Sequence, residues 1–135
     1  MSEEAKDANM EPHIVGWNEV ITNDKAATVE FYTKLFGWTT QEMPMPDGNS
    51  YTIFHKGDRP VAGCAQPPAE AGGQPCWMQY VNVEDLDARL AHAAGLGANV
   101  IMPRTDIPMG SFAVIADPRG AVFAFWQYNP DYKDC

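Results

Sequence analysis

The stretch DKAATVEFYTKLFGW, residues 24–38, decides the first part of the fold. Asp24 is a residue type that caps helix N-termini, and Gly37 is suited to the left-handed conformation that ends a helix. Apolar side chains between them recur at helical spacing. The stretch therefore predicts a helix of about three turns.

Extended segments lie on both sides of this helix. Residues 13–22 alternate in character and predict a strand. One face of that strand carries His13, Val15, Trp17, Glu19 and Ile21. After the helix, residues 38–43, 51–56 and 61–66 read as further strands separated by Pro, Asp, Gly and Asn turns. The first half thus predicts the order βαβββ.

The same order recurs in the second half. A strand at 77–83 precedes an Asp85-capped helix at 86–94, and three more strands follow. Those strands are expected at 98–103, 111–116 and 121–127. A constant offset of 60 relates Trp17 to Trp77, Glu19 to Gln79, Asp24 to Glu84, and Gly37 to Gly97. This offset predicts an internal repeat.

The expected organisation is one domain over residues 12–130. Module 1 spans about 12–66 and module 2 about 76–128, joined by a Pro- and Gly-rich linker at 67–75. Residues 1–11 are polar and acidic without apolar periodicity, so we expect a disordered tail, and a second short tail at 129–135.

Composition restricts the partners. Nine basic residues stand against 18 acidic ones, a net charge of -9, and no basic cluster is present, so nucleic acid is not expected as a partner. No apolar run reaches the roughly 18 residues of a membrane span, and the first residues do not resemble a signal peptide. We therefore expect no membrane association and a cytoplasmic protein with reduced thiols.

Together these segments resemble the glyoxalase/bleomycin-resistance/dioxygenase superfamily, also called vicinal oxygen chelate proteins. The matching segments are residues 17–20, 24–27, 31–38, 83–87, 95–98 and 117–123. The resemblance implies an α+β fold of two tandem βαβββ modules that form a cup-shaped, incompletely closed mixed β-barrel with flanking helices. It also implies a homodimer, and a small-molecule ligand bound between the modules.

Enzymes of this superfamily usually hold a divalent metal with His and Glu side chains on the first and last strands. The corresponding positions here are Trp17 and Ala124, which the repeat relates to Trp77 and Cys64. Indole and methyl groups are not metal ligands, so we expect no metal and no cofactor. The alternative is a divalent metal such as Fe, Mn, Ni or Zn, if the strand register is wrong by one residue. The three histidines His13, His55 and His92 are not expected to converge on a metal.

Glu19 is the candidate catalytic base, because a carboxylate in a half-buried strand can have its pKa raised by desolvation. The candidate ligand-binding residues are Trp17, Glu19, Tyr51, Cys64, Trp77, Gln79 and Trp126. The leading hypothesis is a metal-independent protein that binds a small aromatic or amphipathic molecule. The alternatives are a lyase, an isomerase or an extradiol-type dioxygenase, or a purely structural role in which these side chains only pack.

Overall fold

The computed structural model describes residues 11–46, 48–67 and 74–131. Both expected helices and all eight expected strands are present in that part of the chain. Their order is β1 (Val15–Ile21), α2 (Lys25–Phe36), β2 (Thr39–Pro44), β3 (Ser50–Lys56), β4 (Arg59–Ala65), β5 (Cys76–Asn82), α3 (Leu86–Gly95), β6 (Asn99–Ile107), β7 (Gly110–Ala116) and β8 (Val122–Tyr128). The predicted α+β class with two βαβββ arrangements is confirmed.

The helix boundaries follow from their caps. The Asp24 carboxylate accepts a hydrogen bond from the Ala27 N–H at the start of α2, and Gly37 ends that helix with φ 72°. Asp85 caps α3 through the Ala88 N–H in the same way. The cap residues and the stop of α2 are those expected from the sequence.

The chain divides into two compact units. Residues 17–78 form one, here called the N-terminal unit. Residues 11–16 and 79–131 form the described part of the other, the C-terminal unit. In the C-terminal unit, the His13 N–H donates to the Asn82 carbonyl at 2.7 Å. Residues 68–73 of the expected linker lie outside the described residues, as does most of each expected tail, so the predicted domain limits stay a prediction.

In the N-terminal unit the strand order is β2-β3-β4-β1, with β1 parallel to β4 and the other pairs antiparallel. Helix α2 packs against one face of this sheet. The core beneath it consists of Val20, Phe54, Ala62 and Cys64, with Val29, Val61, Tyr32 and Trp38 packed against them.

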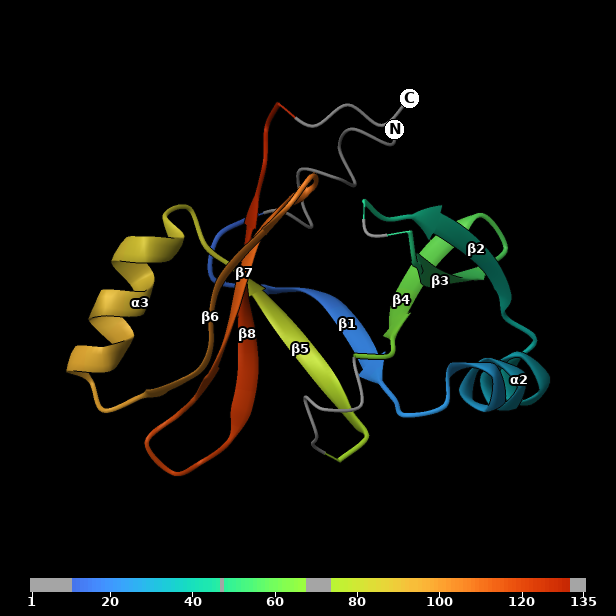
Figure 1. Ribbon diagram of the computed structural model, residues 1–135, viewed down its shortest axis with the longest axis horizontal. Helices are drawn as coiled ribbons and strands as arrows, with labels where there is room; N and C mark the ends of the chain where they lie inside the picture. The colour runs from blue at the N-terminus through green and yellow to red at the C-terminus, as the bar shows by residue number, and fades with distance from the viewer. Residues whose placement is uncertain (1–10, 47, 68–73, 132–135) are drawn as a thin grey trace. The chain divides into compact units, whose positions relative to one another are not determined.

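The C-terminal unit repeats the pattern in the order β5-β8-β7-β6, with β5 parallel to β8. Helix α3 lies along β6, β7 and β8 (Figure 1). Its buried core contains Val83, Leu86, Ala113, Ile115 and Phe125. The opposite face of each sheet is turned away from the helix of its own unit and is called the helix-free face below.

The offset between the two halves is not 60 throughout, which corrects the sequence reading. Core positions, helix caps and paired strands correspond at 61: Val20 with Val81, Asp24 with Asp85, Gly63 with Ala124, Cys64 with Phe125, and Gln66 with Gln127. The glycines after the helices, Gly37 and Gly97, and the first paired residues of β2 and β6, Thr39 and Asn99, correspond at 60. The offset falls to 60 because α3, with 10 residues, is shorter than α2, with 12. It returns to 61 because β6 contains register shifts in its pairing with β7.

Candidate functional site

The helix-free face of the N-terminal unit carries the first group of candidate residues. Val20 points toward α2 in the core, so strand alternation places Trp17 and Glu19 on the other face. Glu19 is only 7% exposed and is engaged with other residues. Its partner in the parallel ladder is Gly63 of β4.

A hydrogen bond joins two of the predicted residues on this face. The Trp17 indole Nε1–H donates to the Tyr51 hydroxyl oxygen at 2.9 Å. Tyr51 lies directly over Gly63, because a Cβ atom added to Gly63 would overlap the Tyr51 hydroxyl and would lie 3.0 Å from Trp17 Nε1. Trp17, Glu19, Tyr51 and Gly63 therefore form one cluster, here called the β1–β4 cluster.

Cys64 does not belong to this cluster. It lies in the core beneath α2 and is fully buried. Burial raises the pKa of its thiol to about 11, and Glu19 and Glu42 add to the increase, while Lys25 opposes it. A thiol with so high a pKa is protonated near neutral pH and is a poor nucleophile. Its predicted contact with a ligand stays a prediction.

Trp77 lies in the N-terminal unit and Gln79 in the C-terminal unit, each with surroundings of its own. Trp77 is 45% exposed, and its Nε1–H donates to the Tyr32 hydroxyl of α2 at 3.1 Å. Gln79 precedes Val81 by two residues, so alternation places it on the face that carries α3. Their roles in ligand binding stay predictions.

Trp126 lies on the helix-free face of the C-terminal unit. It pairs with Phe112 across the β7–β8 ladder, and a Cβ added at Gly110 would lie 2.8 Å from its ring. Tyr80 meets Phe112 edge to face, with 6.4 Å between ring centroids. Each unit thus carries aromatic side chains on its own helix-free face.

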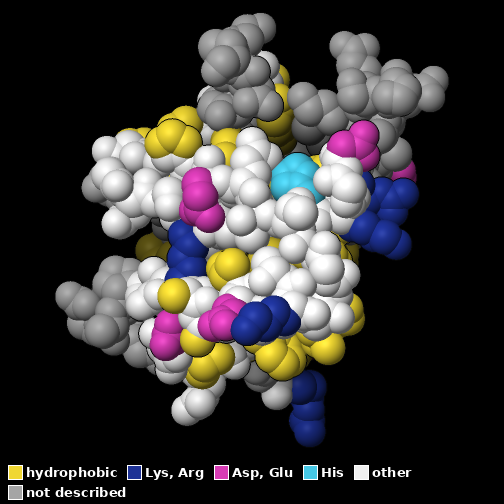
Figure 2. Space-filling model, turned by 90° about the vertical axis from the view of Figure 1, so that its right-hand side faces the viewer, with side chains coloured by type: hydrophobic (Ala, Val, Ile, Leu, Met, Phe, Trp, Pro, Cys, Tyr) yellow, Lys and Arg dark blue, Asp and Glu magenta, His cyan; other side chains and the backbone are white. Residues whose placement is uncertain are grey.

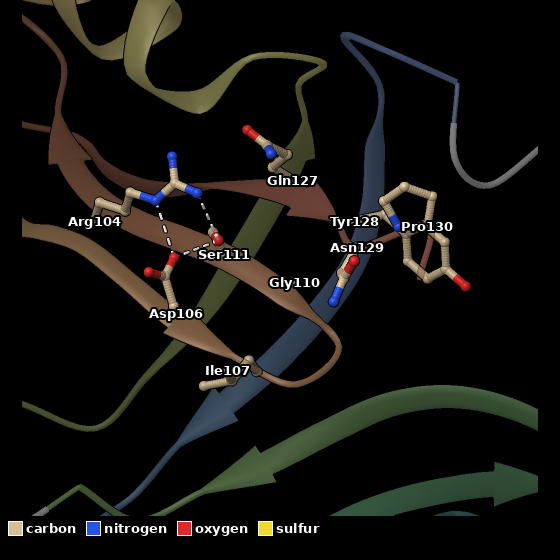
Figure 3. A pocket seen from close by; sticks show the side chains of 9 residues that line it. All are labelled: Arg104, Asp106, Ile107, Gly110, Ser111, Gln127, Tyr128, Asn129 and Pro130. Carbon is tan, nitrogen blue, oxygen red and sulfur yellow. Dashed lines mark hydrogen bonds and ion pairs between the residues drawn. The ribbon is translucent and has the colours of Figure 1, made fainter. Parts of the chain in front are cut away.

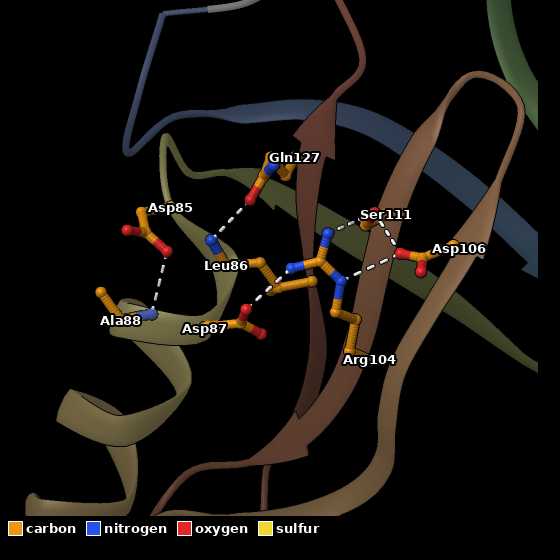
Figure 4. A network of polar contacts seen from close by, with 8 residues as sticks. All are labelled: Asp85, Leu86, Asp87, Ala88, Arg104, Asp106, Ser111 and Gln127. Atoms are coloured by element: carbon orange, nitrogen blue, oxygen red, sulfur yellow. Dashed lines mark hydrogen bonds and ion pairs between the residues drawn. The ribbon is translucent and has the colours of Figure 1, made fainter.

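A polar network that the sequence reading missed lies on the α3 side of the C-terminal unit. The Arg104 guanidinium donates to Asp106 at 2.9 Å, to Asp87 of α3 at 3.0 Å and to Ser111 at 3.2 Å (Figure 4). Hydrogen bonds to Asp106 and Asp87 raise the pKa of Arg104, and those from Ser111 and Arg104 lower the pKa of Asp106. The spacing of Arg104 and Asp106 on one strand was the available signal.

This network borders a cavity of about 250 Å³ at the β6–β7 hairpin end (Figure 3). The lining residues are Arg104, Asp106, Ile107, Gly110, Ser111, Gln127, Tyr128, Asn129 and Pro130. Arg104 already has two carboxylate partners, so the cavity wall offers little uncompensated positive charge. We interpret the network as a bridge between α3 and the outer hairpin.

The N-terminal unit has a related bridge with different residues. Glu42 of β2 accepts hydrogen bonds from Ser50 at 2.8 Å and from Thr52, and it pairs with Lys25 of α2 at 3.5 Å. Burial acts to raise the pKa of Glu42, but the Ser50 and Thr52 hydrogen bonds and the Lys25 charge together lower it. We call these two networks the polar bridges.

The face drawn in Figure 2 carries side chains of both charges. Basic and acidic side chains lie interspersed with hydrophobic ones on that face, rather than in a block of one charge. Neither described helix is long and apolar enough to cross a bilayer.

Comparison with known proteins identifies the family. The model of the Glyoxalase/Bleomycin resistance protein/Dioxygenase superfamily matches residues 12–125. The chain belongs to this superfamily.

Two named relatives of this superfamily member come from a Mycobacterium and a Streptomyces species. The "Putative glyoxylase CFP32" of Mycobacterium bovis is 39% identical over 115 residues, covering 84% of this chain and 44% of that protein. The "Anthracycline biosynthesis protein DnrV" of Streptomyces peucetius is 34% identical over 130 residues, covering 86% of this chain and 47% of that protein. The chain thus spans less than half the length of the curated relatives it matches.

Solved structures support the fold assignment. A hypothetical protein of Bacillus halodurans superposes with a TM-score of 0.63 at 12% identity, over 92% of this chain and all of the other. A likeness at so low an identity shows the fold alone.

The side chains at the positions where the resemblance predicts metal ligands are not metal donors. With the corrected offset, the counterparts of Trp17 and Ala124 are Met78 and Gly63, instead of Trp77 and Cys64. None of these four carries a carboxylate or imidazole. Within residues 11–46, 48–67 and 74–131, no three His, Cys, Asp or Glu side chains are grouped to hold a metal ion.

Proposed function

We propose that this superfamily member binds a small aromatic or amphipathic molecule against the β1–β4 cluster and needs no metal to do so. The observation that carries the proposal is the contact between Trp17, Tyr51 and Gly63. At the positions where a metal enzyme would present ligand side chains, this chain has the indole of Trp17 and the glycine Gly63. The phenol of Tyr51 covers Gly63. Such groups suit stacking and hydrogen bonding to an organic molecule.

The relatives are consistent with an aromatic ligand. One is named for anthracycline biosynthesis, and anthracyclines contain planar fused rings. Trp17 and Tyr51 in the N-terminal unit, and Trp126 in the C-terminal unit, offer ring faces of that kind.

The superfamily resemblance also leads us to propose a homodimer, which sedimentation equilibrium over a range of protein concentrations would test.

A catalytic alternative rests on Glu19. A buried carboxylate on the same face as the two rings could act as a general base in a metal-free lyase or isomerase. Glu19→Gln separates the two functions: an enzyme should lose turnover and keep ligand affinity, whereas a binding protein has no turnover to lose. The dioxygenase alternative requires a divalent metal such as Fe, Mn, Ni or Zn.

Two measurements test the proposal together. Elemental mass spectrometry on protein purified without chelators should find less than stoichiometric metal. Titration with anthraquinone-2-sulfonate, a soluble planar ring system, should quench tryptophan fluorescence saturably, and Trp17→Phe should weaken the binding. Stoichiometric metal, or the absence of saturable quenching by this and other planar aromatic compounds, would refute the proposal.

A further inference from the structure

The hydrogen bond between Trp17 and Tyr51 joins two strands that are not neighbours in the sheet. In the order β2-β3-β4-β1, strand β4 lies between β3, which carries Tyr51, and β1, which carries Trp17. The phenol therefore crosses over β4 to accept the indole N–H. It can do so because Gly63 of β4 has no side chain in its path. The contact is a bridge over a strand, attached at each end to a strand of the same sheet.

This bridge uses the only polar group of the Trp17 side chain. Indole has one hydrogen-bond donor, the Nε1–H, and no acceptor, and here the Tyr51 oxygen accepts that hydrogen bond at 2.9 Å. Among the described residues, the ring contacts of the N-terminal unit include Trp38 and Trp77 but not Trp17, which is partly exposed. A ligand can therefore meet Trp17 only through its carbon face and edges.

The second half of the chain has no such bridge. The positions 61 residues after its three members carry Met78, Phe112 and Ala124. These side chains cannot form an indole-to-phenol hydrogen bond. The strands β5, β8 and β7 nevertheless pair in the same directions as β1, β4 and β3. A βαβββ module thus folds without the bridge, which favours a role for it in ligand binding.

We propose that Tyr51 is a positioning residue, which holds the Trp17 indole in one orientation so that the site selects a flat aromatic ligand over a flexible aliphatic amphipath. The inference rests on the proposed function and chooses between the two ligand classes named there. A ring that is already held in its bound orientation loses less conformational freedom on binding than a mobile one. Stacking on the indole face adds an attraction that an alkyl chain does not obtain.

Nuclear magnetic resonance of the ligand-free protein tests the positioning. The chain has 4 tryptophans, and the indole N–H signal that is missing in Trp17→Phe is that of Trp17. Tyr51→Phe removes the acceptor and should speed hydrogen exchange of the Trp17 N–H about tenfold. Tyr32→Phe is the matched control, because it removes the same kind of acceptor from Trp77. It should alter the Trp77 signal and leave exchange at Trp17 unchanged.

A pair of sulfonates tests the selection. Anthraquinone-2-sulfonate is flat and aromatic, whereas decane-1-sulfonate carries the same charged group on a flexible alkyl chain. Tryptophan quenching measures the first affinity, and displacement of the first compound measures the second. The wild-type protein should bind anthraquinone-2-sulfonate at least roughly fivefold more tightly than decane-1-sulfonate.

The same variants locate the selection. In Tyr51→Phe the affinity for anthraquinone-2-sulfonate should fall about fivefold, because the freed indole must be ordered on binding, and the affinity for decane-1-sulfonate should change less than about twofold. Tyr32→Phe should keep the wild-type preference.

Spectra of the wild-type protein during the titration replace the variant if Tyr51→Phe fails to fold by circular dichroism. Saturating anthraquinone-2-sulfonate should shift the Trp17 indole signal through the ring current of the stacked ligand. Saturating decane-1-sulfonate should leave that signal nearly in place. A Trp17 signal that does not move at saturation with the aromatic compound would overturn the inference.

The failures of the two proposals are distinguishable. Unchanged exchange at Trp17 in a folded Tyr51→Phe protein, or an affinity for decane-1-sulfonate that equals or exceeds that for the aromatic compound, would overturn the inference and leave ligand binding at the β1–β4 cluster standing. If neither sulfonate binds, the proposed function fails and the inference fails with it.

Discussion

The two units share their backbone connections but reverse the charges of their polar bridges. In each unit the first N–H of the helix donates to a glutamine near the end of a core strand: Lys25 to Gln66, just after β4, at 2.8 Å, and Leu86 to Gln127, within β8, at 2.7 Å. In the N-terminal unit the helix carries the cation and the hairpin carries the carboxylate. In the C-terminal unit, Asp87 lies on the helix and Arg104 on the hairpin.

Each unit thus joins its helix to its outer hairpin by an ion pair, and the order of the charges differs between the units. The lowered pKa values of Glu42 and Asp106 arise from hydrogen bonds within these bridges. In this protein they therefore reflect structural contacts and do not by themselves identify a catalytic site. The units differ more deeply on the helix-free face, where Gly63 and Tyr51 in one unit correspond in position to Ala124 and Phe112 in the other.

The largest expected effect concerns that difference. Gly63→Ala should destabilise the protein by about 3 kcal/mol, because the added methyl group overlaps the Tyr51 hydroxyl. Its counterpart Ala124→Gly should cost about 1 kcal/mol. Urea unfolding measures both. Gly95→Ala is the control, since nothing lies within 4 Å of its added Cβ. A harmless Gly63→Ala would show that Tyr51 is not fixed over β4.

The buried thiol of the N-terminal unit gives the next effect. In a Cys76→Ser/Cys135→Ser protein, Cys64 should react with a disulfide reagent at pH 8 at least roughly a hundredfold more slowly than a free thiol, because its pKa is about 11 and it is buried. The same protein in denaturant should react at the ordinary rate. Rapid labelling of the folded protein would show that Cys64 is accessible, and it would support the predicted contact between Cys64 and a ligand.

The glutamine caps should be equivalent in the two units. Gln66→Ala and Gln127→Ala each remove one acceptor from a helix N–H and should each lower the free energy of unfolding by about 1 kcal/mol. The exposed Gln74→Ala serves as the control. A twofold or larger difference between the two losses would show that the units do not use this contact alike.

The smallest effect is the pH dependence of the polar bridges. Glu42 and Asp106 have lowered pKa values in the folded protein, so their stabilising contribution is present above the ordinary carboxyl pKa, near 4, and is lost as the pH falls through the lower folded values. The urea midpoint should fall on acidification, and Glu42→Gln should reduce that slope. Glu30→Gln, an exposed carboxylate on α2, is the control. An unchanged slope in Glu42→Gln would contradict the assignment.

Much of the fold was predictable because its signals are local. Asp24, Asp85 and Gly37 lie at the helix boundaries because capping depends on one or two hydrogen bonds and one dihedral angle. The superfamily resemblance was also confirmed, since it depends on segments spread over the whole chain.

The facing of the second half was not predictable from the matched tryptophans. Trp17 and Trp77 suggested an offset of 60, but strand facing follows core packing, which pairs Val20 with Val81. One residue of error reverses every side chain on a strand. The Tyr51–Gly63 contact and the Arg104–Asp87 ion pair join residues far apart in the sequence, so no short motif predicts them. In the Arg104 network, the spacing of Arg104 and Asp106 was the one local signal.

The division of the chain between the units has a consequence for synthesis. The N-terminal unit is continuous, so its strands can pair as soon as residue 78 has left the ribosome. The C-terminal unit cannot form its contacts until later. Its residues 11–16 are synthesised before the N-terminal unit, but their partner Asn82 comes after the entire N-terminal unit in the sequence. Closing so long a loop is less costly once the intervening chain has already folded and brought its ends together. We therefore expect translation to impose an order on folding, with the leading segment held unpaired until the second half of the protein emerges.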